Sequence, residues 1–251
     1  MSLVIAGYGY VGKAFHEAFK DVETIHIVDP KVNNNKLSDF DFTHVVIAVS
    51  TPGKEDGSCD MTNVIDVVKQ CSTQTSIMIK STISMEGWQK LRQDFPDHRI
   101  TFSPEFLRAK TATEDFKDTK HFYLAGQWSH NWIPMLKKVF PTAQYSVRKT
   151  PEELIAAKYF RNAYLATKVS FFNQVHDFCE ATGIKFSQVH EVITDDPRIG
   201  RDHSNVTPNR GFGGHCLPKD TEAIAHTADL AKVDLSLIKA ALEYNKKIRK
   251  D

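Results

Sequence analysis

A glycine-rich turn near the N-terminus limits the folds open to this chain more than any other feature. The sequence GYGYVG over residues 7–12 follows an apolar run over 3–6 and opens an amphipathic stretch over 11–19. This order predicts a buried strand, a tight turn and a helix whose first N–H groups point at a phosphate. Gly7 permits the turn, Gly9 lets the backbone approach a pyrophosphate, and Gly12 lets the helix pack on the strand.

An acidic residue at the end of the next predicted strand strengthens this interpretation. Asp29 follows the β-branched run over 24–28 and lies 22 residues after Gly7. A carboxylate there accepts hydrogen bonds from the ribose hydroxyls of NAD and repels the 2′-phosphate of NADP, although the nearby Lys31 partly offsets that repulsion. The alternative is a glycine-rich turn beside an Asp that only caps a strand. Spacing and context together favour an NAD site.

The rest of the chain divides into two patterns. Short apolar runs alternate with amphipathic stretches up to about residue 150, which is typical of parallel strands linked by helices. From Thr150 a helical start signal, Pro151 and two acids, opens one long helical pattern over 152–183. A polar stretch over 195–210 and a helical pattern from Asp220 follow, and 230–248 reads as one further helix. Strands are expected at 3–6, 24–28, 44–49, 76–80, 99–102 and 121–125, and helices of the first part at 11–19, 62–71, 88–94 and 131–140.

We therefore predict an α/β fold with two domains. Residues 1–147 would form a Rossmann-type, doubly wound parallel sheet that binds NAD, and residues 148–251 an all-helical domain. With 32 Lys and Arg against 31 Asp and Glu, the chain has no charge excess suited to nucleic acid. No apolar run approaches the roughly 18 residues of a membrane span, and we expect a cytoplasmic protein that contacts neither nucleic acid nor membrane.

The cysteines argue against a metal site and against a disulfide scaffold. Cys59, Cys71, Cys179 and Cys216 form no Cys-x-x-Cys pair, and the ordinary interpretation of each is a small buried hydrophobe. Cys216 differs because it lies in the segment GFGGHCLPKD over 211–220. Glycines let a ligand approach the thiol, while Lys219 and a following helix N-terminus would favour the thiolate.

The segment ending Cys-Leu-Pro-Lys-Asp resembles the catalytic segment of the UDP-glucose/GDP-mannose dehydrogenase family. Further motifs occur in the family's order along almost the whole chain. They are GYGYVG at 7–12, STP at 50–52, KST at 80–82, SPEFLR at 103–108, the pair Lys158 and Asn162, Asn173, and DPRIG at 196–200.

The resemblance implies oxidation of a nucleotide sugar, UDP-glucose being favoured, at C6 from alcohol to carboxylate, a step in polysaccharide biosynthesis. Cys216 would capture the intermediate aldehyde as a thiohemiacetal, which is oxidised to a thioester and hydrolysed, with two NAD used per turnover. Lys158 and Asn162, four residues apart and hence on one helix face, would donate to the developing oxyanion. The alternative for this pair is a solvated helix face.

The resemblance also implies roles for other residues. Asp220 with Thr82 would position a water, and Glu105 would assist thioester hydrolysis, its alternative being an ordinary acid at a helix start. Arg198 would reach the sugar nucleotide of a neighbouring subunit, or else form a surface ion pair. The NAD contacts would be Gly7, Gly9, Tyr10, Val11, Gly12, Asp29, Lys31, Thr51, Thr82 and Lys219, and the substrate contacts Glu105, Phe106, Leu107, Arg108, Lys158, Asn162, Arg198 and Gly213.

Some positions depart from the family. Ala109 and Lys110 replace a Glu and a Gly found in many members, and Ile155 replaces a Glu. The loop over 203–210 also lacks the Tyr-Asn-Asn pattern of bacterial UDP-glucose enzymes. Family members continue into a further domain that binds much of the substrate nucleotide, and we expect this chain to lack it.

The missing domain leaves the partners and the activity open. The helical part is expected to form a homodimer, and a separate protein is a candidate source of the missing domain. Two other functions compete with the dehydrogenase. One is a non-catalytic NAD-binding or assembly module. The other is a hydroxyacid dehydrogenase that transfers a single hydride, which leaves Cys216 unexplained.

Overall fold

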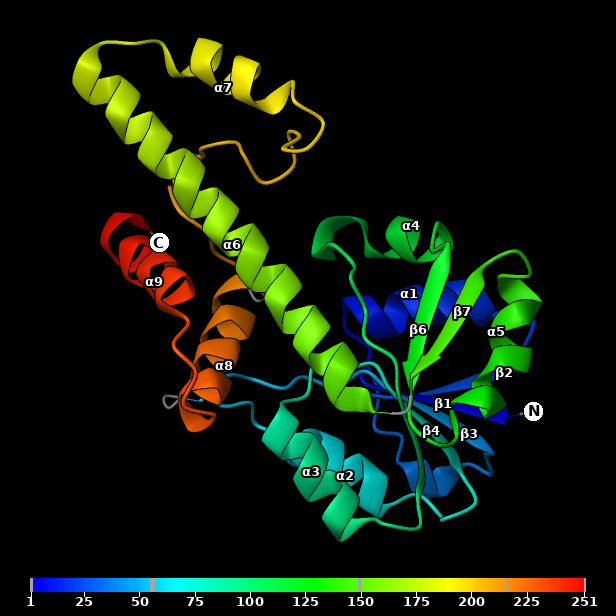
Figure 1. Cartoon of the computed structure of the whole chain (residues 1–251). Helices are drawn as coiled ribbons and strands as arrows, with labels where there is room; N and C mark the ends of the chain where they lie inside the picture. The colour runs from blue at the N-terminus through cyan, green and yellow to red at the C-terminus, as the bar shows by residue number, and fades with distance from the viewer. Residues whose placement is uncertain (1, 55–56, 149, 215, 251) are drawn as a thin grey trace. The chain divides into compact units, whose positions relative to one another are not determined.

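The computed structural model describes residues 2–54, 57–148, 150–214 and 216–250 (Figure 1). The chain forms two compact units. The first comprises Met1–Pro52 and Cys59–Lys158, and the second comprises Gly53–Ser58 and Tyr159–Asp251. The predicted boundary at residue 147 lies just before the long helix, whereas the units divide inside that helix, so the boundary stays a prediction.

A seven-stranded sheet in the order β2-β1-β3-β4-β5-β6-β7 forms the centre of the first unit. The strands from β2 to β5 are parallel, which confirms the predicted doubly wound sheet, and β6 and β7 are parallel to each other. However, β6 runs antiparallel to β5 through the pair Phe102–Ala125, which the sequence did not indicate. The strands are β1 Ser2–Ala6, β2 Thr24–Val28, β3 His44–Ile47, β4 Ser76–Ile79, β5 Arg99–Phe102, β6 His121–Ala125 and β7 Gln144–Arg148.

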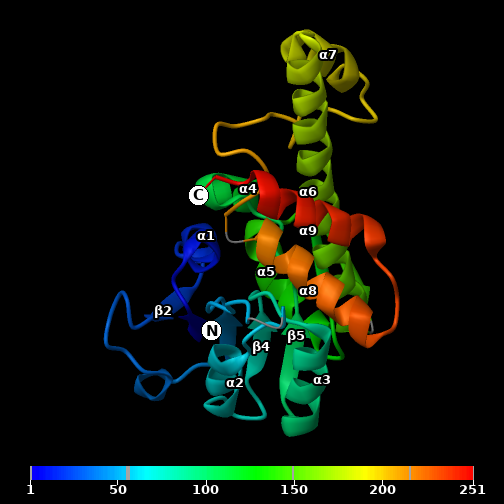
Figure 2. The ribbon, with the colours of Figure 1, turned by 90° about the vertical axis from the view of Figure 1, so that its left-hand side faces the viewer.

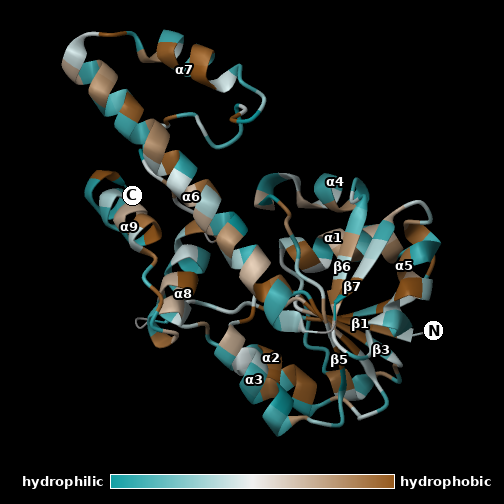
Figure 3. Ribbon diagram, in the orientation of Figure 1, coloured by the Kyte–Doolittle hydropathy of each residue, from teal (hydrophilic) through white to brown (hydrophobic). Residues whose placement is uncertain are grey.

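Helices cover both faces of this sheet. Side chains of α1, α4 and α5 pack with Ile5, Val46 and Met78 in one apolar core. The helices α2 and α3 lie side by side on the other face (Figures 1 and 2). Because both faces are covered, the central strands are apolar along their length, as Figure 3 shows. The helices are α1 Tyr10–Phe19, α2 Thr62–Lys69, α3 Met85–Asp94, α4 Ala112–Lys117 and α5 Ile133–Val139.

The second unit is helical. The long helix α6, Pro151–Thr182, begins in the first unit and continues into the second, where α7 Phe186–Thr194, α8 Leu217–Leu230 and α9 Ser236–Ile248 follow. Its small core contains Ala166 and Val169 of α6 with Phe212, against which Leu217 and Leu242 pack. No helix in the described part of the chain is long and apolar enough to cross a membrane.

Several element predictions need correction. The helix expected over 230–248 is interrupted, since α8 ends at Leu230 and α9 begins at Ser236, with Lys232 in a left-handed conformation between them. The helix expected from Asp220 starts at Leu217. The helices α4 and α7 and the edge strand β7 were not predicted from the sequence, because each is short.

Candidate active site

The three glycines of the first turn have different surroundings. Gly7 has φ +92°, and a Cβ there would lie 2.5 Å from the Ala48 carbonyl oxygen. A Cβ on Gly12 would lie 2.1 Å from the Gly7 carbonyl oxygen, whereas one on Gly9 would meet nothing within 4 Å. The first and third glycines are therefore required by the fold. Gly9 instead borders open space, as a backbone that receives a pyrophosphate requires.

The electrostatics of this turn also fit NAD. Gly9 caps α1 without a side-chain acceptor, and the first turn, which includes Tyr10 and Val11, holds no acid, so the positive end of the helix dipole faces a phosphate position. Asp29 follows β2, and its carboxylate accepts hydrogen bonds from the backbone N–H groups of Tyr8 at 2.6 Å and Lys31 at 2.8 Å. These bonds hold the carboxylate beside the turn.

Three other predicted site residues lie at the same edge of the sheet as the glycine-rich turn. Thr51, Thr82 and Glu105 come just after the carboxyl ends of β3, β4 and β5, as Gly7 does after β1. Ligands of doubly wound sheets bind at this edge. Thr51 is buried, and Thr82 is half-buried.

A buried cluster of charges lies at this edge. The Lys158 Nζ, on α6, donates to Glu105 Oε1 at 2.8 Å, and Glu105 Oε2 accepts the Leu107 N–H at 2.8 Å. Lys158 and Glu105 are only 3% and 7% exposed. The alternatives from the sequence are therefore wrong here: Lys158 is not on a solvated face, and Glu105 does not begin a helix.

Lys80 is a second cation near Glu105 that was not predicted as a site residue. It directly follows β4, is 3% exposed, and donates from Nζ to Ser103 Oγ at 3.0 Å. Its ammonium also lies 5.8 Å from the ring centres of Phe116 and Phe122. A lysine directly after the apolar run SIMI was the available signal, because a charge that ends a central parallel strand faces the ligand edge.

The charges of this cluster shift one another's titration. Burial lowers the pKa of Lys80 to about 8, although Glu105 opposes the shift and Lys158 adds to it. Burial works to raise the pKa of Glu105, but the charge and hydrogen bond of Lys158, the Leu107 N–H and Lys80 together hold that pKa below its usual value. Glu105 is thus a carboxylate at neutral pH, as a base requires.

In the second unit, Cys216 lies at the start of a helix. It is the N-cap residue of α8, with Pro218 in the first turn, and it is half-buried. Cys59, Cys71 and Cys179 are buried thiols, which confirms their interpretation as small hydrophobes. Burial raises the pKa of Cys71 to about 12. Cys216 is thus the half-buried thiol among the four cysteines.

One turn into α8, Asp220 is held by two side chains. Its side chain is 1% exposed; Oδ2 accepts a hydrogen bond from Asn162 Nδ2 at 2.6 Å, and Oδ1 accepts one from Lys219 Nζ at 2.7 Å. Asn162 comes from α6, one turn beyond Lys158. The predicted pairing of Thr82 with Asp220 joins residues of different units and stays a prediction.

Three side chains predicted to contact the substrate each pair or pack with another side chain of the protein. Arg198 is 87% exposed and pairs with Asp196, with 2.5 Å between Nη2 and Oδ2, so it forms the surface ion pair expected as the alternative. Arg108 pairs with Asp115 at 2.6 Å between Nη2 and Oδ1. Phe106 packs edge-on to Tyr123, with ring centres 6.5 Å apart.

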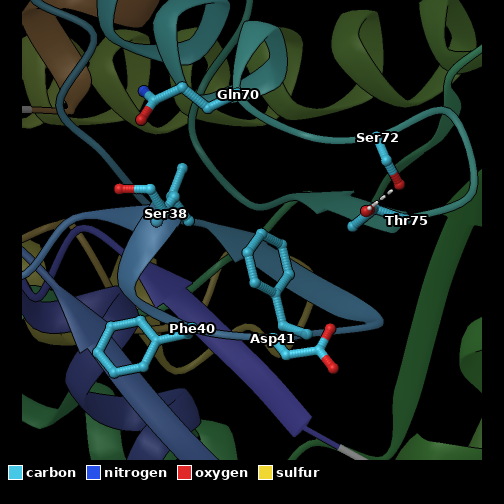
Figure 4. A pocket seen from close by; sticks show the side chains of 8 residues that line it. Ser38, Phe40, Asp41, Gln70, Ser72 and Thr75 are labelled. Carbon is cyan, nitrogen blue, oxygen red and sulfur yellow. Dashed lines mark hydrogen bonds between the residues drawn. The ribbon is translucent and has the colours of Figure 1, made fainter.

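Two hollows of the first unit lie away from the predicted residues. One, of about 390 Å³, lies near the amino ends of β3 and β4, where Phe40 and Asp41 lie opposite Ser72 and Thr75, whose hydroxyls are 3.0 Å apart (Figure 4). The other, of about 270 Å³, is lined by Trp88 and Trp128 among others. Neither contains a predicted site residue. No group of three or more metal-ligating side chains occurs in the portion of the chain that the structure covers.

Comparison with known proteins identifies the family. Residues 31–144 match the NAD binding domain, and residues 153–247 the central domain, of the UDP-glucose/GDP-mannose dehydrogenase family. The chain belongs to this family. It therefore carries the family's NAD binding domain, as the glycine-rich turn and Asp29 predict.

Relatives show how much of a family member is present. A UDP-glucose 6-dehydrogenase of Rickettsia prowazekii is 30% identical over 227 residues, which are 86% of this chain and 51% of that protein. The chain thus spans about half the length of such relatives. A UDP-glucose dehydrogenase of the archaeon Pyrobaculum islandicum has the same fold, with a TM-score of 0.78 at 24% identity over 98% of this chain and 68% of that one.

The fold alone is shared more widely. A 3-hydroxyisobutyrate dehydrogenase of Mycobacterium tuberculosis matches 98% of this chain and 93% of its own, with a TM-score of 0.73 at 16% identity. This likeness shows the arrangement of strands and helices and nothing of the chemistry. The choice between reactions therefore depends on the site residues.

Proposed function

We propose that this chain catalyses the NAD-dependent oxidation of a nucleotide sugar, with UDP-glucose as the favoured substrate, at C6 from the alcohol to the carboxylate. The observation that carries the proposal is the position of Cys216, a half-buried thiol at the N-terminus of α8, one turn before the buried Asp220. A single hydride transfer needs no such thiol. A four-electron oxidation does, because the aldehyde must be held before it is oxidised again.

The proposed reaction consists of two oxidations, with capture of the aldehyde by Cys216 between them and hydrolysis of a thioester at the end. Bound NAD would supply the acceptor for one hydride from C6 in each of the two oxidations. In the first oxidation the C6 hydroxyl also loses its proton, to the water held by Asp220 and Thr82. After the first, the Cys216 sulfur adds to the aldehyde carbon, and the oxygen takes up a proton to give a thiohemiacetal. Loss of that proton and of the second hydride leaves a thioester. Water then adds to the thioester carbon, the C–S bond breaks, and the thiol and the carboxylate are released.

The other residues act on charge and protons in this scheme. Lys158 and Asn162, one turn apart on α6, donate to the C6 oxygen as negative charge develops on it. Glu105, whose pKa is held low by its neighbours despite burial, accepts a proton from the water that attacks the thioester. Asp220, fixed by Asn162 and Lys219, orients a water with Thr82.

The NAD site uses the carboxyl edge of the sheet. Tyr10 and Val11 at the start of α1 face the pyrophosphate, Asp29 accepts hydrogen bonds from the ribose hydroxyls, and Thr51 contacts the cofactor. Lys31, Thr82 and Lys219 complete the proposed set. The proposed substrate contacts remain Phe106, Leu107, Arg108, Arg198 and Gly213 together with Glu105, Lys158 and Asn162.

A second copy of the chain is the proposed partner of α6. Phe160, Tyr164, Phe171 and Phe178 are 45%, 63%, 53% and 62% exposed and recur along this helix at intervals of four and seven residues. Such an apolar stripe on a helix is suited to packing against another helix. We propose a homodimer formed through this stripe. We also propose a reducing cytoplasm as the compartment.

A panel of nucleotide sugars, assayed for NADH formation, tests the proposal. We expect two NADH per UDP-glucose from the unaltered chain and no turnover from Cys216→Ser, while the control Cys59→Ser, a buried thiol, keeps its activity. NAD binding by calorimetry with no NADH from any sugar would favour the non-catalytic module instead. One NADH per substrate, retained in Cys216→Ser, would favour the hydroxyacid dehydrogenase.

A further inference from the structure

The backbone that leads to Cys216 is held by side chains from two helices that lie far from it in sequence. The segment 210–213 contains two of the three glycines of the cysteine motif, and it contacts both α6 and α9. All of these contacts lie within the second unit.

Asn245, on α9, pairs with both backbone groups of one residue in this segment. Its Oδ1 accepts the Phe212 N–H at 2.7 Å, and its Nδ2 donates to the Phe212 carbonyl oxygen at 3.0 Å. The amide side chain thus pairs with the backbone as a neighbouring strand would. The ring of Phe212 is 3% exposed and packs into the small core of the unit, so this residue is fixed by both its backbone and its side chain.

Asn173, on α6, holds the two residues before Phe212. Its Oδ1 accepts the Gly211 N–H at 3.1 Å and the Arg210 Nε–H at 2.8 Å, and the residue is 1% exposed. Arg210 and Gly211 have φ of +56° and +52°. Two successive left-handed residues, one of them not glycine, persist only where the surroundings enforce that conformation.

Arg249, just after α9, also contacts the segment 210–213. Its Nη1 donates to the Arg210 carbonyl oxygen at 3.1 Å, and a Cβ on Gly213 would lie 2.4 Å from its Nη2. Gly213 therefore has a packing role in addition to any contact with substrate. On the other side of Cys216, Leu217 packs against the same core as Phe212. The reacting thiol thus lies between two anchored residues.

We propose that Asn245 and Asn173 are positioning residues for Cys216: they hold segment 210–213 so that the thiol stays at the N-cap of α8. The inference rests on the proposed function in that Cys216 is the reacting group. It adds α9, which carries none of the residues predicted from the sequence, to the elements on which the chemistry depends.

The thiol itself supplies a test that requires no substrate. We would measure the alkylation rate of Cys216 by iodoacetamide at pH 7 with peptide mass spectrometry, in the full chain and in Asn245→Leu. The thiol of Cys216 is half-buried, so release of the segment that holds it should expose the thiol and speed alkylation about tenfold. Glu243→Ala, a control on an exposed part of α9, should react as the unaltered chain does. An unchanged or lower alkylation rate in Asn245→Leu overturns the proposal.

A second variant and a second readout separate positioning from folding. Asn245→Asp keeps an acceptor for the Phe212 N–H but loses the donor to its carbonyl. We expect its alkylation rate to rise about threefold to tenfold with an unchanged circular dichroism spectrum. In turnover, both variants should form fewer than two NADH per UDP-glucose, because aldehyde escapes before capture. A lower fraction of folded protein reduces the rate but not this ratio. If the unaltered chain forms no NADH, the proposed function fails, while the alkylation result still decides the positioning role.

Discussion

The buried pair of Glu105 and Lys158 allows a sharp test of the electrostatics at the sheet edge. The two charged atoms are 2.8 Å apart, and the side chains are 6% and 4% exposed. At an effective dielectric constant of about 20, two unit charges at this distance attract by about 6 kcal/mol, most of which is offset by the cost of taking both from water. Removal of one partner leaves the other charged and buried, which typically costs about 3–5 kcal/mol.

The two single substitutions should differ because Lys80 is the third member of the cluster. Glu105→Gln leaves two buried lysines without a carboxylate, and we expect it to lower the free energy of unfolding by about 3–5 kcal/mol. Lys158→Met leaves Glu105 with the charge of Lys80, and we expect a loss of about 2–3 kcal/mol. The double variant should recover about 2 kcal/mol relative to the sum of the two losses.

Urea unfolding of the full chain, followed by circular dichroism, measures these values. A matched control is Lys90→Met, which removes the cation from a pair with Asp94 whose side chains are 66% and 42% exposed and should cost about 1 kcal/mol or less. Equal losses for Glu105→Gln and Lys158→Met would show that Lys80 does not act on Glu105. Losses below about 1 kcal/mol that simply add would refute the buried pair itself.

Three further predictions concern the turn, the cluster and the choice of cofactor. Gly9→Ala should weaken NAD binding at least about tenfold in calorimetry with little change in melting temperature, because its Cβ enters open space. Gly7→Ala should instead destabilise the fold by about 2 kcal/mol or more. Equal stability losses in the two variants would contradict these roles. The pKa of Lys80 is about 8 against its usual 10.5, so with rising pH the native state loses this proton before the unfolded state does. The free energy of unfolding should therefore rise by on the order of 3 kcal/mol between pH 8 and pH 10.5. In urea unfolding, Lys80→Met should lack this rise. Asp29→Asn should reduce the preference for NAD over NADP about tenfold in calorimetric titrations, because the repulsion of a 2′-phosphate is lost while Lys31 remains; an unchanged ratio would place the ribose elsewhere.

The features predicted from the sequence were those whose cause is local. The glycine-rich turn, the strand that ends before Asp29 and the start of α6 at Pro151 depend on neighbouring residues, so their patterns are visible in the chain. In the same way, the pattern of Cys216, its glycines and a helix start lies within ten residues. Its exact place, at the N-cap of a helix that begins at Leu217, emerged only from the structure.

The features that were missed depend on contacts between distant residues. Lys80 becomes a member of the Glu105 cluster only because β4 and β5 are neighbours in the sheet. Asn245 reaches Phe212 across 33 residues, and no periodicity in α9 marks it. The antiparallel direction of β6 relative to β5 likewise depends on the path of the chain through α4, and no local pattern in the sequence encodes that path.

Mass spectrometry of the chain during turnover tests the central claim most directly. The full chain would be mixed with UDP-glucose and NAD, quenched with acid within one turnover and digested. Our account predicts that the peptide containing Cys216 gains the mass of the oxidised sugar nucleotide as a thioester, and that the adduct disappears on treatment with hydroxylamine. NADH formation without an adduct on Cys216, or with an adduct on another residue, would contradict it.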